Sequence, residues 1–238
     1  MVVVTLEVLK EIKNTEFPEK YLDIKKQVRQ AIVKKVMSGD AKLDDGQFPL
    51  GYTDKEQDLV LLFIKWIATN NEIIGNLNIV LNDIRTLPFT YTLLKGDPLQ
   101  RYKFLVRTFF YEFYRVREKY NQITKALIKE GFIEKQTTLE MRNLFHLTFK
   151  DTITLRNALV HGSVVWRGTL IADLQLIKMA RKANGSIQSK ETGETWDETN
   201  ILTELCNESA DELSNEGNRV SKFLSSLILL CAEEVSNK

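Results

Sequence analysis

The sequence predicts an all-α protein, a helical bundle with long helices. All four prolines fall within the first hundred residues, so the rest of the chain lacks the residue that most often breaks helices. In that part, apolar residues recur at alternating steps of three and four, which is the spacing of one helix face. With 238 residues, 43% hydrophobic and 27% charged, the chain has the composition of an ordinary globular protein with a sizeable core.

The first hundred residues are divided by Pro18, Pro49, Pro88 and Pro98. The segments between them predict helices at about 18–38, 54–69 and 71–86, joined by polar or glycine-containing loops such as SGDAKLDDGQFPLG. We therefore expect residues 1–98 to form an N-terminal helical region, of a type that the sequence does not identify, packed on the rest of the chain.

A single long helix is predicted after Pro98, and Gly131 ends it. One face of this helix carries Tyr102, Val106, Phe109, Phe113, Val116, Tyr120, Ile123 and Leu127. Aromatic residues in such a stripe are typical of a bundle core, and we interpret them so rather than as a platform for stacking nucleic-acid bases.

A second helix is predicted from Thr137 or Thr138, with Glu140 near a capping-box position, up to His161 and Gly162. A closing helix or helix pair covers roughly 197–235, where the apolar positions are Leu202, Cys206, Leu213, Val220, Phe223, Leu227 and Leu230.

The segment 169–192 has a different pattern. Apolar and more polar residues alternate there, and Asn184-Gly185 is a strong signal for a two-residue hairpin turn; the apolar members are Leu170, Ala172, Leu174 and Leu176. We predict a small β-hairpin inserted near 169–192, with a short helix ending at Asn184-Gly185 as the alternative.

Charge and cysteine content restrict the function classes. Lys and Arg outnumber Asp and Glu by only 33 to 32, so the whole molecule has no net attraction for nucleic acid or an anionic membrane, although local basic patches can still bind them. Two basic sets are interpreted first as solvated helix faces, with RNA contact as the alternative: Lys25, Lys26, Arg29, Lys34 and Lys35, and Arg101, Lys103, Arg107, Arg115, Arg117 and Lys119.

Cys206 and Cys231 fall on apolar helix positions and are expected to be buried thiols, which fits a reducing cytoplasm. The apolar run in MVVVTLEVLKEIK is too short for a signal peptide or anchor, and no later window approaches the roughly 20 apolar residues that span a bilayer. We therefore expect a cytoplasmic protein without a membrane partner, and we identify no cofactor-binding or metal-ligating residues.

Residues 155–162, LRNALVHG, hold one of only two histidines in the chain. Arg156 is followed by Asn157, and His161 stands five positions after the arginine. This arrangement resembles the R-x4-6-H signature of the HEPN superfamily, whose common form has a polar residue such as Asn after the Arg. The resemblance covers residues 99–235, and we assign 99–238 to an HEPN-like helical bundle.

The resemblance implies a homodimeric helical domain. Many HEPN proteins are metal-independent ribonucleases of toxin, abortive-infection or CRISPR-type defence systems, so RNA and an antitoxin or defence partner become expected ligands. The residue types suit this chemistry. An imidazole can take the proton of the 2′-hydroxyl and protonate the leaving 5′ oxygen, and a guanidinium can stabilise the charge that builds on the phosphate. We predict Arg156 and His161 as catalytic, with Asn157, Ser163 and Asp151 in support.

Helix geometry also favours a dimer. Five residues on a regular helix turn through about 500°, so Arg156 and His161 project roughly 140° apart and do not converge on one phosphate without a helix end or a second subunit. One departure from the family is Ser163, which stands where HEPN toxins silenced by a nucleotidyltransferase carry the Tyr of R-x4-H-x-Tyr.

Structural interpretations remain beside the catalytic one. Arg156 can cap the C-terminus of the helix or pair with Asp151, and His161 can be a histidine at the helix end whose hydrogen bonds are made within the fold. An HEPN-like module can also lack activity and bind RNA or a protein partner. A second pair, Arg142 and His146, is four residues apart and therefore one short of the family range. We interpret it as a structural pair that can line the same cleft.

Overall fold

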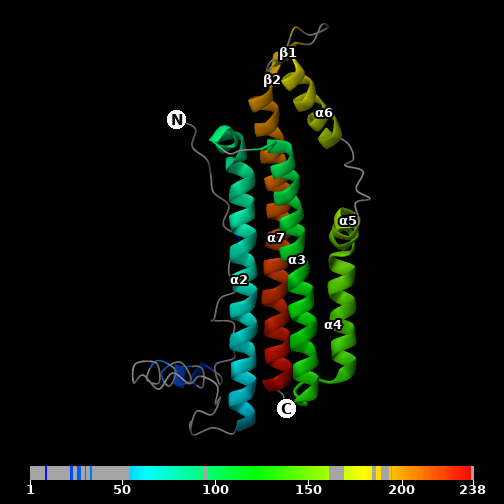
Figure 1. Ribbon diagram of the computed structural model, residues 1–238. Coiled ribbons are helices and arrows are strands. Elements are labelled where there is room, and N and C mark those ends of the chain that lie inside the picture. Colours follow the sequence, from blue (N-terminus) through cyan, green and yellow to red (C-terminus); the bar gives the residue numbers. More distant parts are fainter. Residues whose placement is uncertain are drawn as a thin grey trace.

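The structure, a computed structural model, describes residues 54–93, 96–160, 169–183, 186–188, 193 and 195–236, and the earlier positions Leu9, Leu22, Asp23, Lys26, Gln27, Gln30 and Val33. Side chains are not described at 54–57, 138, 160, 169–174, 181 and 229–236. The described part contains six α-helices, one short 3-10 helix and one two-stranded hairpin (Figure 1). The predicted all-α class with a small hairpin is confirmed.

Three long helices lie side by side and form the body of the bundle (Figure 1). They are α2 (Asp54–Thr90), α3 (Pro98–Lys129) and α7 (Glu198–Ser236), and the 3-10 helix η3 (Tyr91–Leu93) follows α2. α2 packs along both α3 and α7, and their inward side chains form one continuous core across residue 98. Its largest fully buried members include Trp66, Tyr102, Tyr120, Phe109, Phe113, Phe145 and Phe149.

α3 follows the sequence prediction closely. Asp97 is its N-cap and accepts a hydrogen bond from the Leu99 amide at 3.0 Å. Gly131, with φ at +72°, ends it in the left-handed conformation that glycine adopts without a steric cost. All members of the predicted aromatic and aliphatic stripe are buried except Ile123, which is partly buried. The stripe is therefore core, as predicted.

The predicted break between 54–69 and 71–86 is wrong, because α2 runs through it without interruption. The hydroxyl of Thr69 donates to the Lys65 carbonyl at 2.8 Å, inside the helix, and Asn70 is fully buried. The local preference of these residues for a loop is worth only tenths of a kcal/mol each. Burial of Ile73 and Ile74 on the next turn outweighs it, since each contributes about 2 kcal/mol.

The predicted helix from Thr137 or Thr138 to His161 is two helices in the described residues, α4 (Lys135–Thr148) and α5 (Lys150–Val160). They meet at Phe149, whose φ of −117° and ψ of 22° leave the helical region. Phe149 is 1% exposed and its ring packs edge-on against Phe113 at 5.4 Å and Phe223 at 5.4 Å. The break thus turns a large aromatic side chain into the core.

α7 stabilises this break with polar contacts. Arg219 donates to the carbonyl of Thr148, the last residue of α4, at 2.9 Å. Glu216 binds Arg219 through one carboxylate oxygen and accepts from the Thr152 hydroxyl at 3.1 Å through the other. The start of α5 is therefore fixed to α7, and α5 follows α4 at an angle, with both helices beside α3 (Figure 1).

The segment after residue 168 begins with α6 (Thr169–Lys182), so the alternating leucines lie in a helix and not in a hairpin strand. Ile177 and Ala180 are buried, and their three-residue spacing lies against the start of α7. The hairpin follows: β1 (Ser186–Gln188) pairs antiparallel with β2 (Thr195–Asp197), with Ile187 opposite Trp196. Both alternatives for 169–192 were thus partly right, and Asn184-Gly185 lies outside the described residues.

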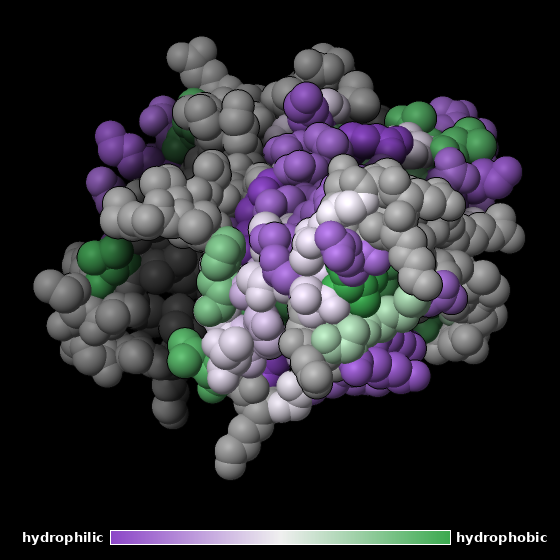
Figure 2. Space-filling view, turned by 90° about the horizontal axis from the view of Figure 1, so that it is seen from above, coloured by the Kyte–Doolittle hydropathy of each residue, from purple (hydrophilic) through white to green (hydrophobic). Residues whose placement is uncertain are grey.

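Seen end-on, with the hairpin toward the viewer, the described surface mixes hydrophilic residues with small separate groups of hydrophobic ones (Figure 2).

Leu9, from the N-terminal region, packs against α2 and α7. It is 1% exposed, and its amide donates to the Asn78 side chain on α2 at 2.6 Å. A Cβ on Gly217 of α7 would lie 2.5 Å from Leu9 Cδ1, so a glycine allows this contact. The described positions between 18 and 38 are helical, in agreement with the predicted helix.

Candidate functional site

Arg156 is the predicted site residue whose surroundings are best defined. It projects from α5 toward α3, where its guanidinium carbon lies 3.9 Å from the ring centroid of Tyr114 and 5.9 Å from that of Tyr111. Its Nη1 donates to the Asn157 side chain at 3.1 Å. The planar cation is stacked on an aromatic face, a contact worth about 1 kcal/mol when partly desolvated. α5 and α3 together therefore hold this guanidinium in one orientation.

The charge of Arg156 is not neutralised within the described part of the chain. Asp151 is exposed and forms no ion pair with Arg156, so the pairing considered from the sequence is not made. The Nε atom of Arg156 is buried and has no hydrogen-bond partner among the described residues. A half-buried guanidinium in this state can accept an anionic ligand.

His161 and Ser163 lie outside the described residues, and α5 is described as far as Val160, the residue before His161. Asn157 is exposed beside Arg156. The structure therefore defines the arginine half of the predicted pair, and the catalytic assignment of His161 stays a prediction.

Arg142 and His146 have different environments on α4. His146 is exposed, whereas Arg142 is half-buried and lines a cavity of about 280 Å³ between α3 and α4. The described residues that line it are Arg117, Tyr120, Asn121, Lys125, Arg142 and Phe145. His146 does not belong to this lining, and a shared cleft with His161 stays a prediction because His161 lies outside the described residues.

Arg117, on α3, lies between Arg142 of α4 and Arg156 of α5. Its guanidinium carbon is 5.6 Å from the Tyr114 ring centroid, and its side chain also lines the cavity of Arg142. Among the described residues, the guanidinium groups of Arg117, Arg142 and Arg156 thus lie where α4 and α5 pack beside α3.

Tyr114, Asn121 and Lys125 were not singled out from the sequence, and Arg117 was assigned to a solvated helix face. The pattern that could have identified them is the spacing 114, 117, 121 and 125, which forms a polar stripe on one face of α3 outside the buried face.

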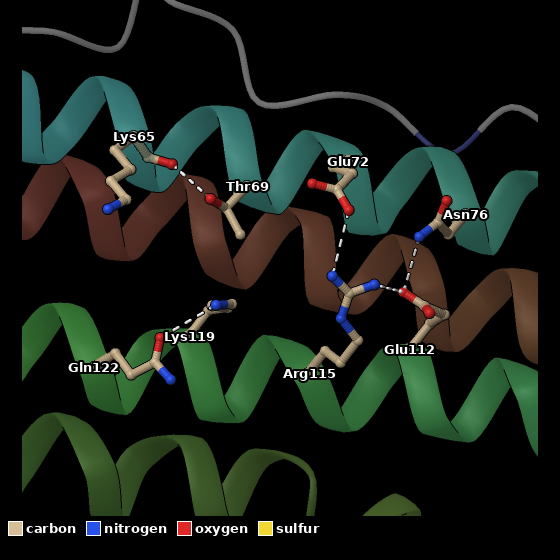
Figure 3. A network of polar contacts seen from close by, with 8 residues as sticks. All are labelled: Lys65, Thr69, Glu72, Asn76, Glu112, Arg115, Lys119 and Gln122. Atoms are coloured by element: carbon tan, nitrogen blue, oxygen red, sulfur yellow. Dashed lines mark hydrogen bonds and ion pairs between the residues drawn. The ribbon is translucent and has the colours of Figure 1, made fainter. Parts of the chain in front are cut away.

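Arg115, two residues before Arg117, has another role. It binds Glu112 at 2.7 Å and Glu72 of α2 at 3.3 Å, and Asn76 of α2 donates to Glu112 at 3.1 Å (Figure 3). Burial by itself lowers the pKa of Arg115, but the two carboxylates outweigh it and raise that pKa above its usual value. Arg115 is therefore a structural cation between α2 and α3, a role that neither the solvated-face interpretation nor the RNA alternative gave it.

Lys119, on the same face of α3, donates to Gln122 at 3.2 Å, within its own helix (Figure 3). Arg101 and Arg107 are exposed. The basic residues of α3 thus fall into a structural group toward α2, an exposed group, and the group beside α4 and α5.

Comparison of the chain with models of protein families, with characterised proteins and with solved structures finds no match. In the described part of the chain, His, Cys, Asp and Glu side chains form no group of three that could hold a metal ion. None of the described helices is long and apolar enough to cross a membrane.

Proposed function

We propose that the chain is a metal-independent endoribonuclease of the HEPN type, which cleaves single-stranded RNA at a site made by two copies of the chain. The observation that supports this proposal most directly is the placement of Arg156: a half-buried guanidinium, stacked on Tyr114 and not neutralised by any described carboxylate. A cation in this state can stabilise the charge of a phosphate in its transition state without first losing an ion-pair partner.

The proposed reaction divides the chemistry between two side chains. His161 takes the proton from the 2′-hydroxyl, whose oxygen attacks the adjacent phosphorus. The P–O5′ bond breaks, and the leaving 5′ oxygen receives a proton from the imidazolium of a second His161. Arg156 stabilises the negative charge on the non-bridging oxygens. The products are a 2′,3′-cyclic phosphate and a 5′-hydroxyl.

The proposed dimer gives one way to bring both side chains to one phosphate. On a regular helix Arg156 and His161 would project roughly 140° apart, and a second copy can supply the group that one helix does not aim at the phosphate. Exposed apolar side chains on α4 and α5 provide surface for such an interface: Leu144 is 48% exposed, Leu147 71% and Leu155 45%. Light scattering at micromolar concentration should give the dimer mass, and a monomer at that concentration would contradict this part of the proposal.

The function itself is tested by incubating the chain with a labelled single-stranded RNA and with DNA of the same sequence, both in EDTA. The RNA should be cut and the DNA should stay intact, because DNA lacks the attacking 2′-hydroxyl. Cleavage that requires a metal ion, or equal cleavage of the DNA, would exclude this mechanism.

A second candidate is a helical module that has no catalytic activity and binds RNA or a protein partner. The same exposed leucines favour it, since a partner protein can cover them as well as a second copy can. Binding of RNA without cleavage by the dimeric chain would support this second function over the first.

A further inference from the structure

The cavity between α3 and α4 is a second cationic site, separate from Arg156. Its volume of about 280 Å³ is far larger than the roughly 30 Å³ that one water molecule occupies in the liquid, and it lies near the lower end of the range for ligand pockets. The cavity therefore has room for a small ligand.

Among the described residues, the lining of the cavity has three cations and no carboxylate: Arg117, Lys125 and Arg142 are accompanied by Tyr120, Asn121 and Phe145. In Arg142, Nε and Nη2 are both buried and have no hydrogen-bond partner among the described residues. Leaving such donors unsatisfied costs free energy, and an anion that accepts from both would remove this cost. Arg115 differs, because two glutamates occupy its donors.

An aromatic pair forms the rigid part of the wall. The rings of Tyr120 and Phe145 are stacked, with centroids 5.8 Å apart and an angle of 16° between their planes, and both residues are almost fully buried. Phe145 also packs edge-on against Phe223 of α7 at 5.5 Å. This packing fixes the separation of α3 and α4 and thereby the positions from which the cations reach the cavity.

The donors come from two helices. Arg117, Asn121 and Lys125 occupy successive turns of α3, and Arg142 reaches the cavity from α4. Two planar guanidinium groups, an ammonium and a side-chain amide can approach one ligand from different directions. That set suits an anion with several oxygens around a tetrahedral centre better than it suits a single carboxylate.

We propose that this cavity binds a phosphate group, at a position distinct from Arg156. The phosphate can belong to the backbone of a bound RNA or to a free phosphate compound. Arg117 contributes to the cavity and also lies beside Tyr114, on which Arg156 stacks, so one RNA strand along α3 can meet both positions. The RNA source rests on the proposed function, whereas the phosphate site itself does not.

The experiment uses the full chain and two probes. A fluorescent 12-nucleotide RNA with 2′-O-methyl groups measures strand binding without cleavage, and inorganic pyrophosphate measures binding of a free phosphate compound by calorimetry. The variants are Arg142→Gln and Lys125→Gln, with Arg107→Gln, an exposed residue of α3 outside the cavity, as the matched control. Thermal melting of each variant checks its fold. Lys125 is exposed, so its replacement keeps the test valid even if Arg142→Gln melts early.

Each cavity variant should weaken at least one probe about tenfold, the loss expected when one charge-assisted contact is removed, and the control should stay within twofold. Weaker RNA binding, with a log–log salt slope smaller by about 0.7, identifies a backbone phosphate as the source. Loss of pyrophosphate binding alone identifies a free phosphate compound.

If the chain binds pyrophosphate through these residues but binds no RNA, the result supports the phosphate site and contradicts the proposed function. The phosphate site is overturned if the parent binds neither probe, or if both cavity variants bind both probes as the parent does.

Discussion

The contact between Arg156 and Tyr114 can be measured by a double-mutant cycle that is independent of any activity. The cycle consists of the parent, Tyr114→Leu, Arg156→Gln and the double variant. Leu keeps an apolar side chain at position 114 but removes the ring face, and Gln keeps a polar side chain at position 156 but removes the cation. The coupling free energy then isolates the interaction of the ring with the guanidinium.

Its magnitude follows from the geometry. The guanidinium carbon of Arg156 is 3.9 Å from the Tyr114 centroid, well inside the roughly 6 Å limit for cation–π contacts. Both side chains are half-buried, between the exposed sites that give about 0.5 kcal/mol and the desolvated sites that give about 2 kcal/mol. We therefore expect a coupling of about 1 kcal/mol. The Tyr111 centroid lies 5.9 Å away, and its coupling to Arg156 should stay below about 0.5 kcal/mol.

Urea unfolding followed by circular dichroism gives the free energy of unfolding for each variant. The matched control is the cycle of Tyr111→Leu with Arg156→Gln. A coupling at Tyr114 within about 0.3 kcal/mol of zero, or one no larger than that at Tyr111, would show that α3 does not hold the guanidinium in the way described.

Three further predictions concern the bundle. Burial raises the pKa of the Cys206 thiol from 9.0 to about 12. Its contribution to the free energy of unfolding is therefore complete below pH 9 and is lost as the pH rises toward 12. Peptide mass spectrometry should find Cys206 unalkylated by iodoacetamide at pH 8 in the native state and alkylated in urea. Tyr102→Phe should lower the free energy of unfolding by about 1–2 kcal/mol, because it leaves the Ser209 hydroxyl, 2.6 Å from the tyrosine oxygen, buried without this partner; Tyr102→Phe combined with Ser209→Ala should recover part of that loss, and equal stability of the two would refute this account. Asp97→Ala should cost about 1 kcal/mol in the same urea titration, since it removes the N-cap of α3, and an unchanged midpoint would show that the cap contributes nothing.

The parts of the fold that were predictable from the sequence are those where one pattern persists over many turns. The stripe from Tyr102 to Leu127 repeats over seven turns of α3, and Pro98 and Gly131 mark its ends, so local and tertiary preferences agree. The closing helix around Cys206 was predictable for the same reason.

The wrong boundaries have tertiary causes. Thr69, Asn70 and Asn71 favour a loop locally, but burial of the apolar residues on both sides keeps α2 continuous. The break at Phe149 depends on Phe113 and Phe223, which are 36 and 74 residues away in the sequence and give no local signal.

The candidate site shows the same division between features that the sequence pattern predicts and features that depend on tertiary packing. Arg156 was identified from the motif LRNALVHG, but its partner Tyr114 is on another helix and was not singled out. Arg142 was noted only for its spacing from His146, whereas the structure joins it with Arg117 and Lys125 across α3 and α4. Spacing on one helix predicts which residues share its face, and it carries no information on which face of the next helix they meet.

The most direct test of the proposed function compares RNA cleavage, thermal melting and dimer mass for His161→Ala, Arg156→Ala and the control His146→Ala. We predict that His161→Ala abolishes cleavage and that Arg156→Ala reduces it by at least a factor of about 100, the loss of one transition-state charge donor. His146→Ala should cut RNA like the parent, since His146 is exposed and lies outside the cavity, and all three should remain folded dimers. If His161→Ala keeps its activity while His146→Ala loses it, or if His161→Ala melts far below the parent, then residues 155–162 are a helix end with a structural role and the protein is not an HEPN-type ribonuclease.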